Sequence, residues 1–378
     1  MVYVGLRSYS LYLWHWPIFV ILRWTVGFES VAMILVGVAL TFLLAEISYR
    51  FVESPIRLAK FHVRFPQWKV ISAGLASILL SAAVCSLLFK GRNHICLSVV
   101  AQHPEIWKVG HPLGPEIKSK TELGAGKRLY VLGDSHAGAY TTMVNRLAKE
   151  HGIEVIMLSA GGMGVADLLN PSQDYSENGV NFKEERLARV LAEAKPGDIV
   201  FLASLRMYRF VNPWDNINEE YVWQSRYGQE AEKTRALALE EAKEIIARLS
   251  ETGATILIDA PKPVLMSPPF RCADWFNRMN PIGKAGFIMD RSFLEEYRQP
   301  MMESLQVLDE QFPQCYLWDP FPVLCPDEMV SAFEPGRPLF SDGDHLSAYG
   351  NHQLYPSFES RILELWELNE RPDAQARE

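Results

Sequence analysis

The sequence lacks the short motifs that mark several common chemistries. It has no glycine-rich phosphate-binding loop, no CxxC or HExxH metal motif and no internal repeat. It also lacks the basic excess that nucleic-acid binding needs, because 37 Lys and Arg stand against 45 Asp and Glu, for a net charge of −8. These absences argue against a nucleotide-binding loop, a zinc site and a nucleic-acid partner.

Cysteine is scarce, with five in 378 residues. Cys85 falls within an apolar run, whereas Cys96, Cys272, Cys315 and Cys325 lie in the part of the chain that we expect outside the cytoplasm. Disulfides persist in such an oxidising compartment, and four cysteines allow three pairings. Free buried thiols are an equally good interpretation.

Charge is missing altogether from residues 70–89, VISAGLASILLSAAVCSLLF. This length matches a helix that crosses the hydrocarbon of a bilayer. Two weaker candidates precede it, at about 8–25 and 30–50, and the first contains His15 and Pro17. We therefore predict that residues 1–90 form a membrane region with three transmembrane helices in contact with lipid.

Basic residues predict the orientation of these helices. Several lie between the second and third spans, whereas the short link between the first two has none; they are Arg50, Arg57, Lys60, Arg64 and Lys69. The positive-inside rule places this loop in the cytoplasm. The chain after about Lys90 then lies outside, which for a bacterium means an inner-membrane protein with a periplasmic domain.

Beyond a linker at 91–126, apolar runs typical of buried strands alternate with helical patterns, and a tail follows at 369–378. Strands are expected at about 128–133, 153–158, 199–204, 255–260 and 315–320, and helices at 136–150, 182–194, 229–251, 292–311 and after 345. Such alternation predicts an α/β domain over 127–368, in which helices cover both faces of a parallel sheet in three layers.

The stretch YVLGDSHAGAY places Ser135 directly after the first expected strand, where sites of parallel sheets lie. A serine hydroxyl needs a base to act as a nucleophile, and the base is commonly a histidine oriented by a carboxylate. The later stretch LFSDGDHLSAYGNH offers His345 as the base, with Asp342 three residues before it as the orienting carboxylate. Asp344 is the alternative carboxylate.

An attacked carbonyl also needs hydrogen-bond donors for its negative charge. The backbone N–H of Ser135 is one candidate, and the N–H of Gly162, in SAGGMG after the second strand, is another. The glycines at 161, 162 and 164 are equally compatible with a plain flexible turn.

GDSH, a glycine after the second strand and DGDH near the end resemble the SGNH hydrolase superfamily over residues 125–365. The resemblance implies an α/β domain that cleaves or transfers acyl groups through Ser135. The family's third block supplies an asparagine to the oxyanion hole, but here that strand ends in LASLRMYR. Either Arg206 or Ser204 replaces this donor, or the hole has two donors.

GLRSYSLYLWHWPIFV and EISYRFVESPIR resemble the last helices of the acyltransferase-three membrane family. In members fused to an SGNH domain, the membrane unit carries an acyl group across the membrane, and the outer domain places it on a sugar hydroxyl. The resemblance implies an acyl donor derived from acetyl-CoA and no bound cofactor or metal. The family's essential histidine and arginine lie in earlier helices, so His15 is not assigned that role; the chain is a fragment, or a separate chain supplies the missing helices.

Three functions fit these features. The first is an O-acyltransferase, acetyl being the expected group, which acylates a polysaccharide or lipid-linked glycan such as lipopolysaccharide. The second is a membrane-anchored esterase of an acylated glycan, and the third is a non-catalytic glycan-binding module. Arg206 and Trp275 are candidate substrate-binding side chains; Trp275, in FRCADWFNRMNP, stacks on a sugar ring or belongs to a loop that packs on the core.

Overall fold

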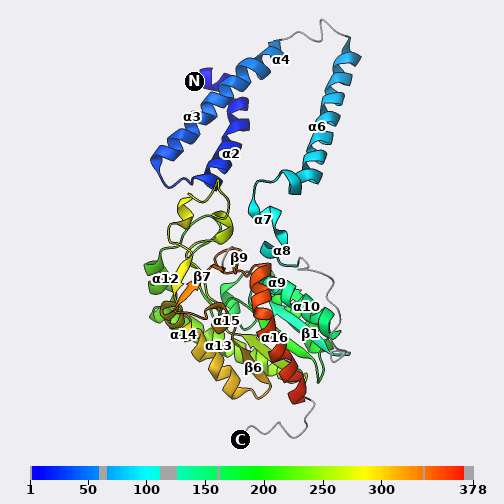
Figure 1. Ribbon diagram of the computed structural model, residues 1–378, viewed down its shortest axis with the longest axis vertical. Coiled ribbons are helices and arrows are strands. Elements are labelled where there is room, and N and C mark those ends of the chain that lie inside the picture. The colour runs from blue at the N-terminus through cyan, green and yellow to red at the C-terminus, as the bar shows by residue number, and fades with distance from the viewer. Residues whose placement is uncertain (1, 59–65, 111–125, 160–161, 335–336, 370–378) are drawn as a thin grey trace. The chain divides into compact units, whose positions relative to one another are not determined.

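The computed structural model describes residues 2–58, 66–110, 126–159, 162–334 and 337–369 (Figure 1). The chain divides into two compact units. The first contains residues 1–102 together with the inserted segment 271–284, and the second contains residues 103–270 and 285–378. The predicted α/β domain, residues 127–368, falls in the second unit apart from the inserted segment, and the second unit begins earlier, at residue 103.

The first unit is helical. Its described helices are α1 (Val2–Leu6), α2 (Ser8–Thr25), α3 (Val31–Ser48), which continues through a π-helical turn (Tyr49–Glu53) into α4 (Ser54–Leu58), α6 (Gln67–Ile95) and α7 (Val99–Gln102). Two stretches, Val31–Leu58 and Gln67–Arg92, are long and apolar enough to span a membrane. The helix α2 forms where the first span was predicted, but it is not one of the two stretches that are long and apolar enough to span a membrane.

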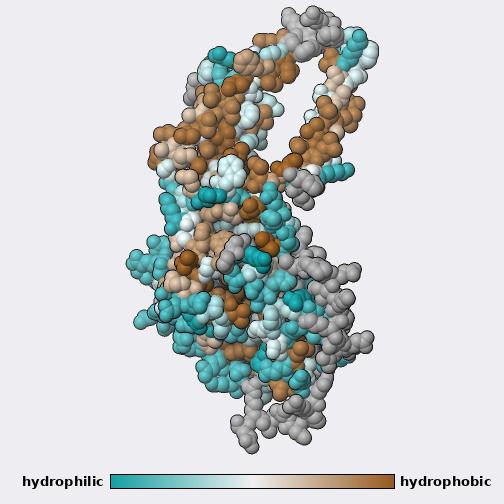
Figure 2. Space-filling model, in the orientation of Figure 1, coloured by the Kyte–Doolittle hydropathy of each residue, from teal (hydrophilic) through white to brown (hydrophobic). Residues whose placement is uncertain are grey.

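Small residues bring α2 and α3 together. Gly37, Thr41 and Ala45, at intervals of four on α3, are buried, and a Cβ on Gly37 would lie 3.3 Å from Leu22 of α2. Small side chains of this kind let the backbones of membrane helices approach closely. By contrast, no residue in the spanning window of α6 is buried, and apolar side chains cover much of the surface of α3 and α6 (Figure 2).

The inserted segment 271–284 caps the end of α2. Asn280 donates from Nδ2 to the carbonyl oxygens of Arg23 and Trp24, at 2.9 and 3.1 Å, and Arg271 donates to the same two carbonyls. The guanidinium of Arg271 also lies 4.2 Å from the ring centroid of Trp24. The last carbonyls of a helix have no partner within it, and the inserted segment supplies these donors.

The second unit is built on a five-stranded parallel sheet in the order β2-β1-β3-β4-β6. The strands are β1 (Arg128–Gly133), β2 (Glu154–Ser159), β3 (Ile199–Ala203), β4 (Thr255–Asp259) and β6 (Cys315–Trp318). The larger helices are α10 (Thr141–His151), α11 (Glu177–Glu193), α12 (Glu219–Arg226), α13 (Gln229–Ser250), α14 (Arg291–Gln311) and α16 (Ala348–Asn369). The predicted α/β fold with a parallel sheet is confirmed.

Side-chain alternation along the strands builds a core on each face of the sheet. In β1, Leu129 and Val131 belong to one apolar cluster, with residues of α10 and α16, whereas Tyr130 and Leu132 belong to the other, with residues of α11 and α13. All four of these β1 side chains are fully buried. The helices therefore form a layer on each side of the sheet (Figure 1).

The strand order defines where a site can form. The chain passes from β1 outward to β2 and then returns to β3 on the other side of β1, so the connections diverge between β1 and β3. Ligands of open α/β sheets bind outside the carboxyl ends of the strands at such a switch point. The short helix α9 (Ser135–Ala139) begins there, directly after β1.

Several short elements were not expected. The predicted linker at 91–126 contains the end of α6, α7 and a further turn, α8 (Pro104–Trp107), while residues 111–125 lie outside the described part of the chain. Two small antiparallel pairs join β5 (Ile288–Asp290) to β7 (Met329–Ser331), and β8 (Phe333–Glu334) to β9 (Arg337–Pro338). A short helix, α15 (Phe321–Leu324), follows β6.

Candidate active site

The turn after β1 exposes Ser135 on a rigid frame. A Cβ on Gly133 would lie 1.7 Å from the carbonyl oxygen of Ala203 in β3, so only glycine fits this position. Asp134 caps α9, accepting the N–H of His136 at 2.8 Å with one carboxylate oxygen and the N–H of Leu205 at 3.3 Å with the other. The aspartate thus joins the turns after β1 and β3, and Ser135 begins the helix with its side chain exposed.

The loop before α16 presents His345. Asp342 accepts the backbone N–H groups of Asp344 and His345, at 3.1 and 2.7 Å, which closes a tight turn. Gly343 is needed at its centre, because a Cβ there would lie 2.3 Å from Val211. The turn therefore fixes the backbone of His345 through the same carboxylate that contacts its ring.

The structure brings Ser135, His345 and Asp342 together. Ser135 Oγ lies 2.7 Å from His345 Nε2, and His345 Nδ1 lies 3.0 and 3.1 Å from the two carboxylate oxygens of Asp342. Because a carboxylate only accepts, Nδ1 carries the proton, and in the neutral ring Nε2 is left free to accept the hydroxyl proton of Ser135. This is the geometry that activates a serine nucleophile.

Carboxylates also set the charge of His345. Burial favours the neutral ring, but hydrogen bonds to Asp342 and Asp344 outweigh it and raise the pKa of His345 to about 9. Asp344 lies 3.3 Å from Nδ1, so both of the aspartates considered from the sequence face the same nitrogen. At pH 7 the resting ring is mostly protonated, and it must release that proton to act as a base.

Two backbone N–H groups remain the candidate donors of an oxyanion hole. Ser135 contributes its N–H at the first position of α9, where helix N–H groups have no partner within the helix. Gly162 has a φ of +94° and is exposed, and it lines the same pocket as Asp134. The neighbouring Gly164 allows close packing, because a Cβ there would lie 2.3 Å from the Cβ of Asp167. Gly161 lies outside the described residues.

The two side chains considered as replacements for the family's asparagine are fully buried. Arg206, at a positive φ of 55°, turns its side chain into the core, pairs with Asp259 and donates to the carbonyl oxygens of Leu202, Ala166 and Asp259. Ser204 is also fully buried. In these contacts Arg206 stabilises the ends of β3 and β4, and it is also among the residues that line the pocket described next. Substrate binding by Arg206, and an oxyanion contact by either side chain, stay predictions.

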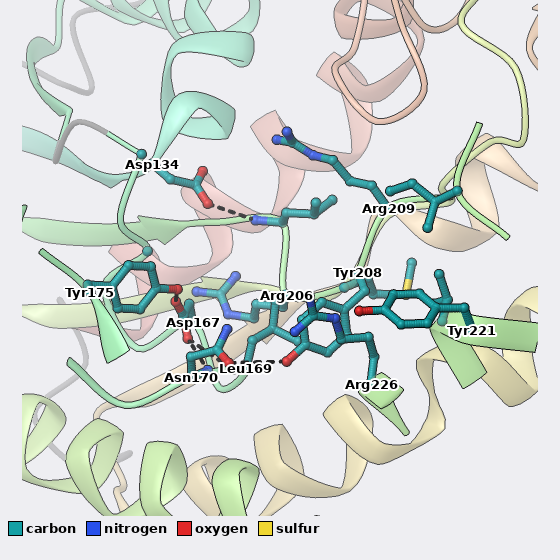
Figure 3. A pocket seen from close by; sticks show the side chains of 16 residues that line it. Asp134, Asp167, Leu169, Asn170, Tyr175, Arg206, Tyr208, Arg209, Tyr221 and Arg226 are labelled. Atoms are coloured by element: carbon teal, nitrogen blue, oxygen red, sulfur yellow. Dashed lines mark hydrogen bonds between the residues drawn. The ribbon is translucent and has the colours of Figure 1, made fainter. Parts of the chain in front are cut away.

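A pocket of about 350 Å³ lies between Asp134, the residue before the serine, and Gly162 on one side and α12 on the other. Figure 3 shows Tyr175, Asp167 and Asn170 along one part of its wall and Tyr208, Tyr221 and Arg226 along another. Tyr175 donates to Asp167 at 2.7 Å, and Tyr208 donates to Asn170 at 3.2 Å. Tyrosine rings with polar ends suit a sugar, which has apolar faces and a hydroxyl edge.

Trp275 does not line this pocket. It lies in the inserted segment of the first unit, and its side chain is 66% exposed. Its role in binding a sugar stays a prediction. No disulfide joins the five cysteines, all of which lie in the described residues, and Cys315 and Cys325 are buried in the second unit, which matches the alternative to disulfides.

The sequence did not indicate a second group of side chains next to Ser135, His345 and Asp342. His136 Nε2 lies 3.2 Å from Asp344, and Arg209 Nε lies 2.5 Å from the same carboxylate oxygen. Ligating atoms of His136, Asp344 and His345 lie within 4.8 Å of one another, a spacing that could hold a metal ion. The GDSH motif itself was the available signal for His136.

Comparison with known proteins identifies the family of the chain. The model of the family described as the SGNH domain fused to AT3 (acyltransferase-three) domains matches residues 108–360. The chain belongs to this family. The SGNH domain so defined contains Ser135, Gly162, Asp342 and His345, and the resemblance inferred from GDSH and DGDH is confirmed.

Individual relatives and solved structures match the chain to different extents. O-acetyltransferase OatA of Staphylococcus aureus is 48% identical over 63 residues, 16% of this chain and 10% of OatA, so the chain spans about a tenth of that relative. The periplasmic domain of the Salmonella ser. Paratyphi A lipopolysaccharide acetyltransferase shares 13% identity, with a TM-score of 0.40 over 74% of this chain and 96% of that domain. Bacillus subtilis YXIM shares 17% identity, with a TM-score of 0.33 over 66% of this chain and 58% of YXIM.

Proposed function

We propose that the protein is an O-acyltransferase that moves an acetyl group, through an ester on Ser135, to a hydroxyl of a cell-envelope polysaccharide or lipid-linked glycan. The observation that carries the proposal is the chain of contacts Ser135–His345–Asp342 at the switch point of the sheet, beside a pocket lined with tyrosines. The 63-residue match to an O-acetyltransferase supports acetyl as the group transferred.

The reaction follows from the geometry in two balanced steps. His345 Nε2 takes the proton of Ser135 Oγ as the oxygen attacks the carbonyl carbon of the donor, and the N–H groups of Ser135 and Gly162 stabilise the oxyanion. The intermediate collapses, the leaving oxygen takes the proton from His345, and an ester of Ser135 remains. The sugar hydroxyl then gives its proton to His345 and attacks this ester, and Ser135 regains a proton as it leaves.

The proposed location follows from the first unit. The basic residues between the two spanning stretches favour a cytoplasmic loop there, which supports a location of the SGNH domain outside the inner membrane, on the periplasmic side. On this arrangement the donor originates from cytoplasmic acetyl-CoA and reaches Ser135 through a membrane acyltransferase unit.

Measuring glycan acetylation in cells tests the direction of the reaction. Deletion of the gene is expected to lower O-acetyl content of the cell-surface glycan, and re-expression of the wild type, but not of Ser135→Ala, restores it. A rise in acetyl content on deletion would show instead that the protein removes acetyl groups with water as the acceptor. Unchanged acetylation together with no Ser135-dependent ester cleavage would contradict both enzymatic functions.

A further inference from the structure

His136, the residue after the proposed nucleophile, packs against the base. Its side chain is fully buried, and its ring stacks on that of His345 with centroids 4.3 Å apart and planes inclined by 7°. Both residues reach this position from well-fixed backbone: His136 lies on α9 and donates its N–H to Asp134, and His345 lies in the turn closed by Asp342. One face of the His345 ring is therefore covered by a second imidazole.

Asp344 joins the two rings. Its carboxylate is buried, with its oxygens 3.2 Å from His136 Nε2 and 3.3 Å from His345 Nδ1, and it also accepts from Arg209 Nε at 2.5 Å. Because the carboxylate only accepts, His136 carries its proton on Nε2. Its Nδ1 is buried with no hydrogen-bond partner in the described part of the chain.

The surroundings keep His136 neutral. Burial, followed by the positive charge of Lys262, lowers the pKa of His136, and these effects exceed the opposite effect of Asp344. Asp344 itself is ionised: burial alone would raise the pKa of Asp344, but hydrogen bonds from His136 and His345 hold it well below its usual range. The charge on the pair of rings therefore resides on His345.

We propose that His136 is a positioning residue, a neutral imidazole that is anchored to Asp344 and holds the His345 ring by stacking, so that Nε2 stays aimed at Ser135. This inference rests on the proposed serine mechanism. His345 must keep one orientation while it takes a proton from the serine, gives it to the leaving group and takes another from the acceptor. A rotated ring would point Nε2 away from the reacting atoms, and a protonated neighbour would repel the imidazolium.

The charged and titratable groups around the base define what the proposal predicts for pH dependence. Asp342, Asp344, Ser135 and His136 face His345 directly. Arg209 reaches it only through Asp344. Removing the Nε2–H of His136 leaves Asp344 with one donor fewer, and its charge then stabilises the imidazolium of His345 more strongly.

Two substitutions separate the ring from the hydrogen bond. His136→Phe keeps a stacking face and removes the donor, whereas His136→Gln keeps an N–H donor and removes the ring. We would measure kcat, KM and pH profiles for hydrolysis of 4-nitrophenyl acetate by the full chain in detergent. His136→Gln is expected to lower kcat about 10–100-fold with KM unchanged, as for a misplaced catalytic group. His136→Phe is expected to lose less kcat and to move the apparent pKa of kcat/KM upward.

Controls distinguish positioning from stability. His151→Phe changes another buried histidine, which contacts Glu359 at 2.7 Å in the same domain, and is expected to leave the pH profile unchanged. Folded His136 variants with wild-type kcat and pH profile would overturn the proposal. So would a loss of kcat that only follows a loss of folded protein, with the profile unmoved.

A spectroscopic measurement checks the state of His136 without turnover. Nitrogen-15 NMR of the histidine-labelled full chain, assigned by difference from His136→Phe, is expected to show a neutral Nε2–H ring at pH 7, and a protonated His136 would overturn the proposal. The failure of the proposed function has a different signature, namely equal ester hydrolysis by the wild type and Ser135→Ala. Failure of the present inference leaves hydrolysis dependent on Ser135 and indifferent to His136.

Discussion

The two units of the molecule place apolar side chains in opposite ways. In α6 of the first unit, Leu79 and Leu80 are 61% and 67% exposed, whereas every residue of β4 in the second unit is buried. Both segments are rich in aliphatic residues, so composition alone does not separate them. The two segments differ in what covers their apolar side chains. Lipid can cover those of α6, whereas those of β4 must be covered by the protein's own helices.

The charged side chains of the two units also differ in where they lie. In the first unit, Glu46 and Glu53 of the long apolar helix pair with Arg7, Arg50 and Arg57. In the second unit, buried charges converge on the carboxyl edge of the sheet, where Asp259 and Asp344 are examples. Buried charges need partners, and in the SGNH domain these partners are also the frame of the proposed active site.

The largest expected effect tests whether the chemistry belongs to the second unit alone. Ser135→Ala is expected to reduce hydrolysis of 4-nitrophenyl acetate at least about 10³-fold, as when a serine nucleophile is removed. His15→Ala in the first unit is expected to change it less than about twofold, because Nδ1 of this exposed ring already contacts the carbonyl oxygen of Tyr12. Hydrolysis that depends on His15 and not on Ser135 would reverse the assignment of the units.

A pair of leucine substitutions sharpens the contrast in burial. Leu257→Ala in β4 removes a fully buried side chain and is expected to cost about 2–5 kcal/mol of unfolding free energy. Leu79→Ala in α6, which is largely exposed, is expected to cost less than about 0.5 kcal/mol. Thermal or denaturant unfolding of the full chain in detergent checks both. Equal costs would mean that α6 is packed against protein in the native state.

The third prediction concerns the charge of the base. Since the pKa of His345 is raised to about 9 and only the neutral ring can accept a proton, kcat/KM is expected to rise with pH up to about 9. Asp342→Asn removes a contact that raises this pKa, so the midpoint is expected to fall, and kcat to drop about 10²–10⁴-fold through loss of orientation. Asp344 lies 3.3 Å from His345 Nδ1 and can still orient the ring in Asp342→Asn, so we expect the loss of kcat to lie near the lower end of this range. An unmoved midpoint would show that Asp342 does not control His345.

The smallest effect probes the first unit. Asn280→Ala removes the donor to the carbonyl oxygens of Arg23 and Trp24 at the end of α2, which is expected to cost about 1 kcal/mol. Met279→Ala, next to it and 84% exposed, is the matched control and is expected to be neutral. The unfolding midpoint of the full chain checks both; equal midpoints for the two variants would show that the cap contributes no stability.

Much of the second unit could be predicted from the sequence because its signals are local. Apolar runs of five or six residues ended by turns indicate the strands, and GDSH and DGDH mark the ends of the two segments that meet at the site. The strand order, by contrast, depends on pairing between distant segments. The strand order places β1 next to β3 at the switch point, where the candidate triad of Ser135, His345 and Asp342 forms.

The contacts that the sequence did not indicate have a physical explanation as well. Arg206 follows a buried strand and its partner Asp259 comes 53 residues later, so only the fold shows that they pair in the core. His136 and Asp344 are separated by 208 residues, so nothing local indicates their contact. The inserted segment 271–284 was considered for a sugar contact because of its aromatic residues, whereas its Arg271 and Asn280 contact the end of α2.

Mass spectrometry of the full chain after brief incubation with 4-nitrophenyl acetate shows whether Ser135 forms the ester. We expect one added acetyl group on the peptide that contains Ser135, none in Ser135→Ala, and loss of the adduct when a glycan acceptor is added. An acetyl group found on another residue, or equal labelling of the wild type and Ser135→Ala, would rule out the serine mechanism.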